Sequence, residues 1–134
     1  MTEERSFTRA EVEALIPRLQ TIMDVVMTSH RDAGAIKEAV VEEQQAIAMS
    51  GGGVIDQAAW RERKARLDDA VARVESGLKD VLALGGVPKD LALGLVDFAH
   101  RREGKVINLC WKSGERAIDW WHGLDEGYGA RKPL

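Results

Sequence analysis

The feature that most constrains the fold of this chain is a seven-residue repeat of apolar residues that begins near its N-terminus. The repeat stays in phase through Val12, Leu19, Val26, Ala33, Val40 and Ile47. Apolar residues with this spacing lie along one stripe of an α-helix. The repeat therefore predicts one continuous helix over residues 8–49, which would be roughly 60 Å long at about 1.5 Å per residue.

The start of this helix carries a capping sequence. The Thr8 hydroxyl can accept a hydrogen bond from the first turn, and the Glu11 carboxylate can accept one from the Thr8 amide, which together make a capping box. Phe7 and Val12 occupy the two positions of a hydrophobic staple. Pro17 lacks an amide hydrogen and should bend the helix. It should not end the helix, because the apolar repeat continues beyond it.

A glycine-rich turn, Ser50 to Gly53, separates this helix from a second one. Asp56 offers an N-cap for a helix over residues 56–85, and Gly85 is placed to end it. The second helix has its own repeat, which consists of Trp60, Leu67, Val74 and Val81. Two such helices joined by a short turn predict an antiparallel coiled-coil hairpin. Because the first helix is the longer one, the C-terminal segment or a second subunit must cover its excess.

From Gly94 onward the apolar period changes from seven to two, which indicates β-strands. Glu103-Gly104 lies between two alternating runs and suits a two-residue hairpin turn. The register of this hairpin places Asp97 opposite Cys110. The apolar face then consists of Val96, Phe98, Ile107, Leu109 and Trp111, and the second face of Asp97, Ala99, Arg101, Asn108 and Cys110.

Residues 117–122 allow two interpretations. As a strand they place His122 on one face with Trp120, and as a helix they place His122 beside Glu115. Adjacent bulky residues favour the strand, which would complete a three-stranded antiparallel meander over residues 94–122.

These elements predict a single α+β domain over residues 1–134. It would consist of a long antiparallel coiled-coil helical hairpin, then the small β-meander, then a glycine-rich C-terminal loop over residues 123–134.

Composition excludes several classes of partner. The formal net charge of -3 gives no basic field for nucleic acid. No apolar run approaches the roughly 20 residues of a membrane span, and the polar N-terminus lacks the apolar core of a signal peptide. The single cysteine excludes an internal disulfide and suits a reducing compartment. We therefore expect a soluble cytoplasmic protein.

Candidate site residues concentrate in the last third of the chain, residues 93–134. It holds three of the four tryptophans, the only cysteine and two of the three histidines. Asp97, Glu115 and His122 could supply one imidazole and two carboxylates to a divalent metal ion. The alternative is that these groups form ordinary ion pairs with arginines, since no fixed metal-binding spacing is present.

Enzymatic functions have weaker support. A carboxylate opposite Cys110 would raise the pKa of the thiol, which argues against a cysteine nucleophile. The sequence contains no serine-protease triad pattern, P-loop or dinucleotide fingerprint. A small enzyme that uses His122 and Glu115 as acid and base stays open, as does haem binding through His122.

An interaction module is the function that the residue pattern favours. Long helices with seven-residue repeats are common dimerisation elements, so we expect a homo-oligomer, with a dimer the simplest form. The tryptophan-rich segment would then be an aromatic anchor.

Several strings in the C-terminal third resemble an uncharacterised prokaryotic family called domain of unknown function 2203. They are GLVDF (94–98), LCWKSGE (109–115), WHGLDEGY (121–128) and ARKPL (130–134). The resemblance covers nearly the whole chain and implies no activity. It departs at Ala99, where the family has proline, and in residues 127–131, where the family reads Gly-Phe-x-Gly-Arg.

The resemblance singles out Asp97, Cys110, Trp111, Glu115, Trp121, His122 and Arg131. Of these, Trp111, Trp121 and Arg131 are the candidate contacts for a small-molecule ligand.

Overall fold

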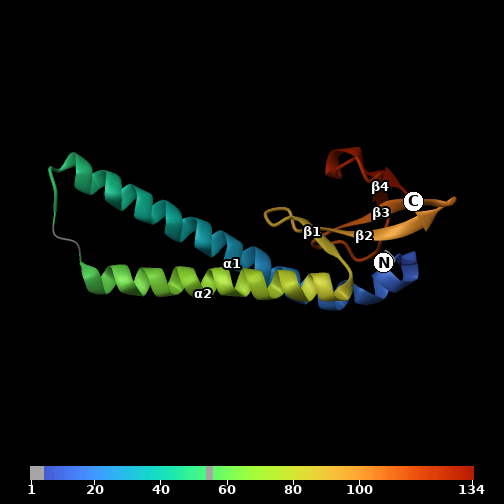
Figure 1. The fold of residues 1–134 in the computed structure, drawn as a ribbon, viewed down its shortest axis with the longest axis horizontal. Coiled ribbons are helices and arrows are strands. Elements are labelled where there is room, and N and C mark those ends of the chain that lie inside the picture. The colour runs from blue at the N-terminus through green and yellow to red at the C-terminus, as the bar shows by residue number, and fades with distance from the viewer. Residues whose placement is uncertain (1–4, 54–55) are drawn as a thin grey trace.

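The computed structural model describes residues 5–53 and 56–134, which form a long helical hairpin with a small sheet at one end (Figure 1). The helices are α1 (Arg9–Met49), α2 (Gln57–Leu84) and a short 3₁₀ helix, η1 (Tyr128–Ala130). The strands are β1 (Val87–Asp90), β2 (Leu95–Arg102), β3 (Lys105–Lys112), β4 (Trp120–His122) and β5 (Lys132–Pro133). The α+β class, with a helical hairpin followed by an antiparallel sheet, is as predicted. In the described ranges, no helix is both long and apolar enough to span a membrane.

Both long helices begin at the predicted caps. The Thr8 hydroxyl accepts a hydrogen bond from the Glu11 amide at 3.1 Å, and the Glu11 carboxylate accepts one from the Thr8 amide at 2.9 Å. Asp56 caps α2 by accepting from the Ala59 amide at 3.1 Å. Gly85 ends α2 with a φ of 99°, a left-handed conformation that glycine adopts without steric cost.

Helix α1 is continuous across Pro17, as the uninterrupted repeat predicts. It changes direction in its N-terminal part (Figure 1), which is the part of the helix that contains Pro17. The first turns of α1 therefore run beneath the sheet, while the rest extends away from it beside α2.

The two helices pack closely near the sheet and separate toward the tip of the hairpin, meaning the C-terminal end of α1 and the N-terminal end of α2 (Figure 1). The helices are in close contact at Gly77, where an added Cβ would lie 2.2 Å from Cγ2 of Val26. At the tip, by contrast, Trp60 is 48% exposed, and Val40 and Ile47 are only partly buried. The seam predicted from the two repeats is thus closed near the sheet and open at the tip.

The sheet has five antiparallel strands in the order β1-β2-β3-β4-β5. The register of β2 with β3 is the predicted one, with Asp97 opposite Cys110 and Phe98 opposite Leu109. Glu103 and Gly104 both have positive φ, 51° and 78°, as a type I′ hairpin turn requires.

Two strands lie outside the predicted meander. β1 contains Pro88, whose missing amide hydrogen is tolerated only at a sheet edge, so its sequence does not look like a strand. β5 has two residues, too few for an alternating pattern, and it lies with η1 in the segment predicted as a loop. Residues 120–122 alone of the ambiguous segment form a strand, β4.

One face of the sheet packs on the N-terminal half of α1. The buried core consists of Phe7, Val12, Ile16, Leu19, Met23, Val26, Val81, Val96, Phe98, Leu109, Trp111 and Ile118. The Phe7 and Phe98 rings meet in a T-shaped arrangement, with centroids 5.4 Å apart. The Phe7 amide also donates to the Ala99 carbonyl at 2.7 Å, so the entry to α1 is tied to β2.

A pair of glycine substitutions tests the close approach of the helices. Gly77→Ala should destabilise the protein by about 1–3 kcal/mol, because the new methyl group must displace the buried Val26 side chain. Gly34→Ala, where nothing lies within 4 Å of the added Cβ, should stabilise it by roughly 0.5–1 kcal/mol through helix propensity. Urea unfolding followed by circular dichroism measures both. A Gly77→Ala variant as stable as Gly34→Ala would contradict the packing.

Candidate functional site

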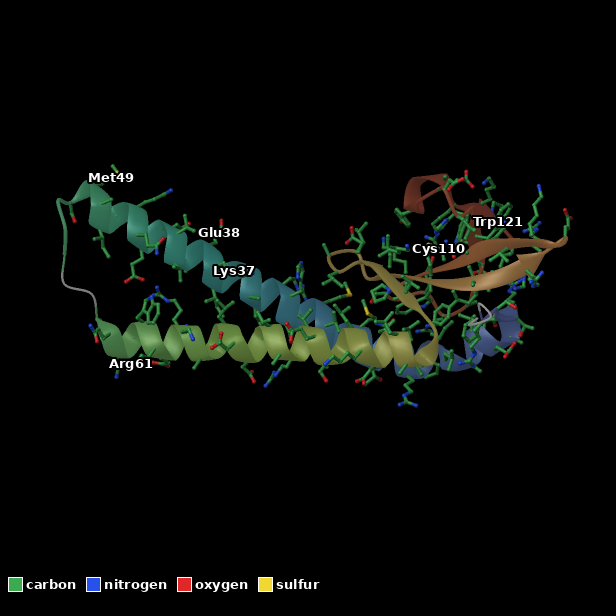
Figure 2. All side chains as sticks on the ribbon, viewed as in Figure 1. Lys37, Glu38, Met49, Arg61, Cys110 and Trp121 are labelled. Atoms are coloured by element: carbon green, nitrogen blue, oxygen red, sulfur yellow. The ribbon has the colours of Figure 1, made fainter. Side chains whose placement is uncertain are left out.

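The face of the sheet turned away from α1 carries a buried cluster of three ionisable side chains. Asp97 comes from β2, Cys110 from β3 and His122 from β4, so three adjacent strands each contribute one residue. Their exposed fractions are 3%, 1% and 2%. A carboxylate oxygen, the thiol sulfur and a ring nitrogen all lie within 4.8 Å of one another. Figure 2 labels Cys110 on the sheet, at the far end of the molecule from Met49 at the tip.

Strand pairing brings this cluster together. Asp97 and Cys110 are directly opposite each other, and His122 is opposite Asn108, which lies on the same face of β3 as Cys110. Residues opposite one another, and their diagonal neighbours, have side chains within reach on one face of an antiparallel sheet. The cluster is therefore held by the sheet itself and not by a loop.

The hydrogen bonds of His122 fix its protonation at one ring nitrogen. Nδ1 lies 2.8 Å from the Gly123 carbonyl oxygen, which can only accept, so Nδ1 must donate. Nε2 lies 3.0 Å from Oδ2 and 3.1 Å from Oδ1 of Asp97. In a neutral imidazole with a protonated Nδ1, Nε2 holds a lone pair that would face another acceptor. A proton or a metal cation must therefore lie between Nε2 and the carboxylate.

The pKa of the Cys110 thiol lies well above its usual range. Burial raises the pKa of its thiol to about 12, and the negative charge of Asp97 acts in the same direction. Arg131 opposes these effects but does not outweigh them. The thiol is thus a poor nucleophile at neutral pH, as the sequence suggested. A bound metal cation would reverse this, because a coordinated thiol is deprotonated.

A cavity of about 110 Å³ opens beside the cluster. Asp97, Cys110 and His122 form part of its wall, and the other lining residues are Lys89, Leu95, Asn108, Leu124, Glu126, Gly127 and Tyr128. The C-terminal segment, residues 123–131, lies over this side of the sheet, opposite α1 (Figure 1). The cluster therefore faces a small space and is not enclosed in the apolar core.

Glu115, the third predicted metal ligand, lies outside the cluster. Its carboxylate accepts two hydrogen bonds from Nη2 of Arg131, at 2.7 and 2.8 Å, and one from the Lys112 amide at 2.7 Å. The structure thus brings two of the three residues of the predicted ligand set, Asp97 and His122, together, and gives Glu115 a partly buried arginine as its partner. This is the ordinary ion pair that the sequence left as an alternative.

The three candidate ligand contacts have different environments. Trp111 is fully buried in the core, and its indole N–H donates to a backbone carbonyl at 2.9 Å, so it has no free face. Trp121 is partly buried against the core, with two cationic side chains over its ring. Arg131 is held between Trp120 and Tyr128, with its guanidinium carbon 5.1 and 5.0 Å from the two ring centroids.

The sequence pattern did not identify Cys110 as a third member of the cluster, although the signal was present. The predicted hairpin register already placed it opposite Asp97. The sequence did not place the His122 side chain beside this pair, because residues 117–122 were consistent with either a strand or a helix. Only the pairing of β4 with β3 settles where its imidazole lies.

The fold and the cluster define an α+β protein with a candidate metal site on a small antiparallel sheet. The chain belongs to the family described as "Uncharacterized conserved protein (DUF2203)", whose sequence profile matches residues 5–134. This confirms the resemblance to domain of unknown function 2203. No curated protein and no solved structure matches the chain.

Thiol labelling tests the environment of Cys110, the only cysteine in the chain. In chelator-treated protein at neutral pH, we expect labelling to be far slower than in the urea-unfolded chain, because the thiol is 1% exposed and its pKa is raised to about 12. The rate should increase as the pH rises toward that value. Absorbance of the released chromophore measures both rates. Equal labelling of folded and unfolded protein at neutral pH would contradict the burial.

Proposed function

We propose that this protein binds a divalent transition-metal ion, with Zn²⁺ the best match, through Asp97, Cys110 and His122. The observation that carries this proposal is the buried approach of two acceptors, Nε2 of His122 and the Asp97 carboxylate, next to a thiol. A cation at this point satisfies the carboxylate, the imidazole lone pair and a thiolate together. Without one, the cluster must retain an additional proton.

The donor set supports a transition metal over Mg²⁺ or Ca²⁺. One oxygen, one nitrogen and one sulfur suit zinc, whereas the two hard ions prefer oxygen ligands alone. Tetrahedral ligands about 2.0–2.3 Å from zinc lie roughly 3.3–3.8 Å apart. The distance of 3.0 Å between Asp97 and His122 is shorter by only a few tenths of an ångström. A small separation of two side chains would therefore admit the ion.

The surroundings of the cluster also support metal binding. Metal-bound histidines usually donate their second ring N–H to a carbonyl or carboxylate, as His122 Nδ1 does to Gly123. Three protein ligands leave the fourth position of a tetrahedral zinc ion open, and here a cavity adjoins the cluster.

Zinc titration of chelator-treated protein, prepared without a histidine tag, tests the proposal. We expect one equivalent to bind and to raise the unfolding temperature. Cys110→Ser and His122→Gln should each weaken binding by about 100-fold or more, since even outer partners of a metal ligand are worth roughly 10–100-fold. Isothermal titration calorimetry at neutral pH measures the affinities.

Two control variants sharpen this test. His30→Gln removes an exposed imidazole on α1 and should leave zinc affinity unchanged. Glu115→Gln should also retain binding, because Glu115 is paired with Arg131 outside the cluster. The proposal fails if the wild-type protein neither takes up zinc nor gains thermal stability. If Glu115→Gln lost as much zinc affinity as Cys110→Ser, Glu115 would be a metal ligand, as the sequence predicted.

A second function, self-association of the hairpin tip into a homodimer, is supported by a different observation. Val40, Trp60 and Leu67 line an apolar groove of about 220 Å³ between the separated helices. Met49, close by at the tip, is 89% exposed (Figure 2). Both apolar repeats thus continue into a region where the chain itself buries them only in part, and a second copy would cover them.

Charge supports a second copy of this chain as the partner. The tip of α1 is acidic through Glu38, Glu42 and Glu43, and the tip of α2 is basic through Arg61, Arg63, Lys64 and Arg66. Arg63 already pairs with Glu43 of the same chain, so the other charges are the ones left for a partner. A two-fold axis between two tips would place α1 of each copy against α2 of the other, so opposite charges would meet twice.

Light scattering across a range of concentrations tests the homodimer. The wild-type chain should show twice the mass of one copy at high concentration. Trp60→Glu should reduce it to one copy, because it replaces the largest apolar side chain of the groove with a hydrated carboxylate. Leu82→Glu, on the same helix but away from the tip and 57% exposed, is the control and should still dimerise. A strict monomer at every concentration would end this proposal.

A further inference from the structure

We infer that the cavity beside the metal position binds a small oxyanion, with one oxygen on the metal and with Lys89 and Asn108 as its protein contacts. This inference rests on the proposed metal centre and names the class of ligand that its open position takes.

Lys89 lines the cavity from an irregular part of the sheet. The register of β1 with β2 runs from Val87 opposite Asp97 to Pro88 opposite Val96, then shifts before Asp90. Lys89 lies in this β-bulge and lines the same cavity as Asp97. Bulges redirect side chains and are frequent beside functional sites. Among residues 5–53 and 56–134, no carboxylate forms an ion pair with Lys89.

Asn108 adds an uncommitted hydrogen-bond donor. It is half-buried, lines the cavity and is opposite His122 in the sheet. Within the described part of the chain its side-chain amide makes no hydrogen bond, so both N–H groups can face a ligand. The hydroxyl of Tyr128, which also lines the cavity, accepts from Lys112 Nζ at 3.5 Å and keeps its own hydrogen to donate.

The charges around the cavity favour an anion. A divalent ion held by a carboxylate, a thiolate and a neutral imidazole has no net charge, so Lys89 adds one positive charge to a neutral centre. The other carboxylate in the wall, Glu126, is already paired with Lys132 at 2.6 Å and accepts from the Gly123 amide at 2.8 Å. The ligand side of the cavity is therefore rich in donors and positive in charge.

The size of the cavity limits the ligand to a few non-hydrogen atoms. Its volume of about 110 Å³ is well below the roughly 300 Å³ at which pockets for drug-sized ligands begin. It exceeds the space that one water molecule needs. The carboxylate of a short organic acid, bicarbonate and phosphate all have this size, and all can place an oxygen on zinc.

Cobalt substitution tests the inference and separates it from the metal proposal. Co²⁺ is added to chelator-treated protein, and a thiolate-to-cobalt charge-transfer band reports the metal centre. Acetate, bicarbonate and phosphate are then titrated separately, and the visible cobalt bands report a change of the fourth ligand. We expect at least one anion to shift these bands saturably. Acetate as the strongest ligand would indicate an organic acid, and bicarbonate or phosphate an inorganic source.

A matched pair of lysine variants assigns the anion to this cavity. Lys89→Met should raise the half-saturating anion concentration about tenfold, since a charge-assisted contact is lost. Lys105→Met removes an exposed lysine at the start of β3, outside the cavity, and should titrate like the wild type.

Two results overturn the inference while leaving the metal centre intact. In one, cobalt binds with its thiolate band but no anion alters the visible bands. In the other, Lys89→Met titrates like Lys105→Met. A protein that shows no thiolate-to-cobalt band overturns the metal centre and the oxyanion together.

Discussion

The antiparallel pairing of β2 with β3 decides which side chains form the core and which form the candidate site. Phe98 and Leu109 face α1, while the adjacent pair, Asp97 and Cys110, faces the C-terminal segment. A slip of one residue would exchange the two faces and press a carboxylate against the apolar stripe of α1. Burying an unpaired carboxylate there would cost several kcal/mol, so the register is strongly specified. The left-handed turn at Glu103-Gly104 favours the same register.

The C-terminal segment depends on this sheet through Arg131. Its guanidinium joins the Glu115 carboxylate to the Cys110 carbonyl, at 3.2 Å, and lies over the ring of Tyr128. One arginine therefore connects the loop after β3, the backbone of the cluster and the segment that covers the cavity. Its Nε atom is buried without a hydrogen-bond partner among the described residues, a small cost that these contacts outweigh.

The elements that could be predicted from the sequence are those whose signals are local. The caps at Thr8 and Asp56, the long apolar repeats and the hairpin turn each specify their structure within a few residues. β1 and β5 could not be predicted, because a short edge strand is defined by its neighbour in the sheet and not by its own pattern.

The candidate site could be predicted only in part, because it too depends on contacts between segments that are distant in the sequence. Asp97 and His122 were selected, but the choice between Glu115 and Cys110 depends on tertiary contacts. Glu115 lies outside the cluster because it forms an ion pair with Arg131, which is distant in the sequence and follows the turn after β4. Cys110 joins the cluster only when β4 pairs with β3. The separation of the helices at the tip could not be predicted from the repeats either, because the repeats continue in phase whether or not the helices stay in contact.

The separation of the three cluster residues along the chain has a thermodynamic consequence. Each comes from a different strand, so the three side chains are not neighbours in the unfolded chain and come together only when the sheet forms. An ion held by all three side chains would bind the native state more tightly than the unfolded chain, and by mass action the unfolding equilibrium would then depend on the free metal concentration. The free energy of unfolding of the sheet would then depend on the free metal concentration of the solution as well as on the sequence.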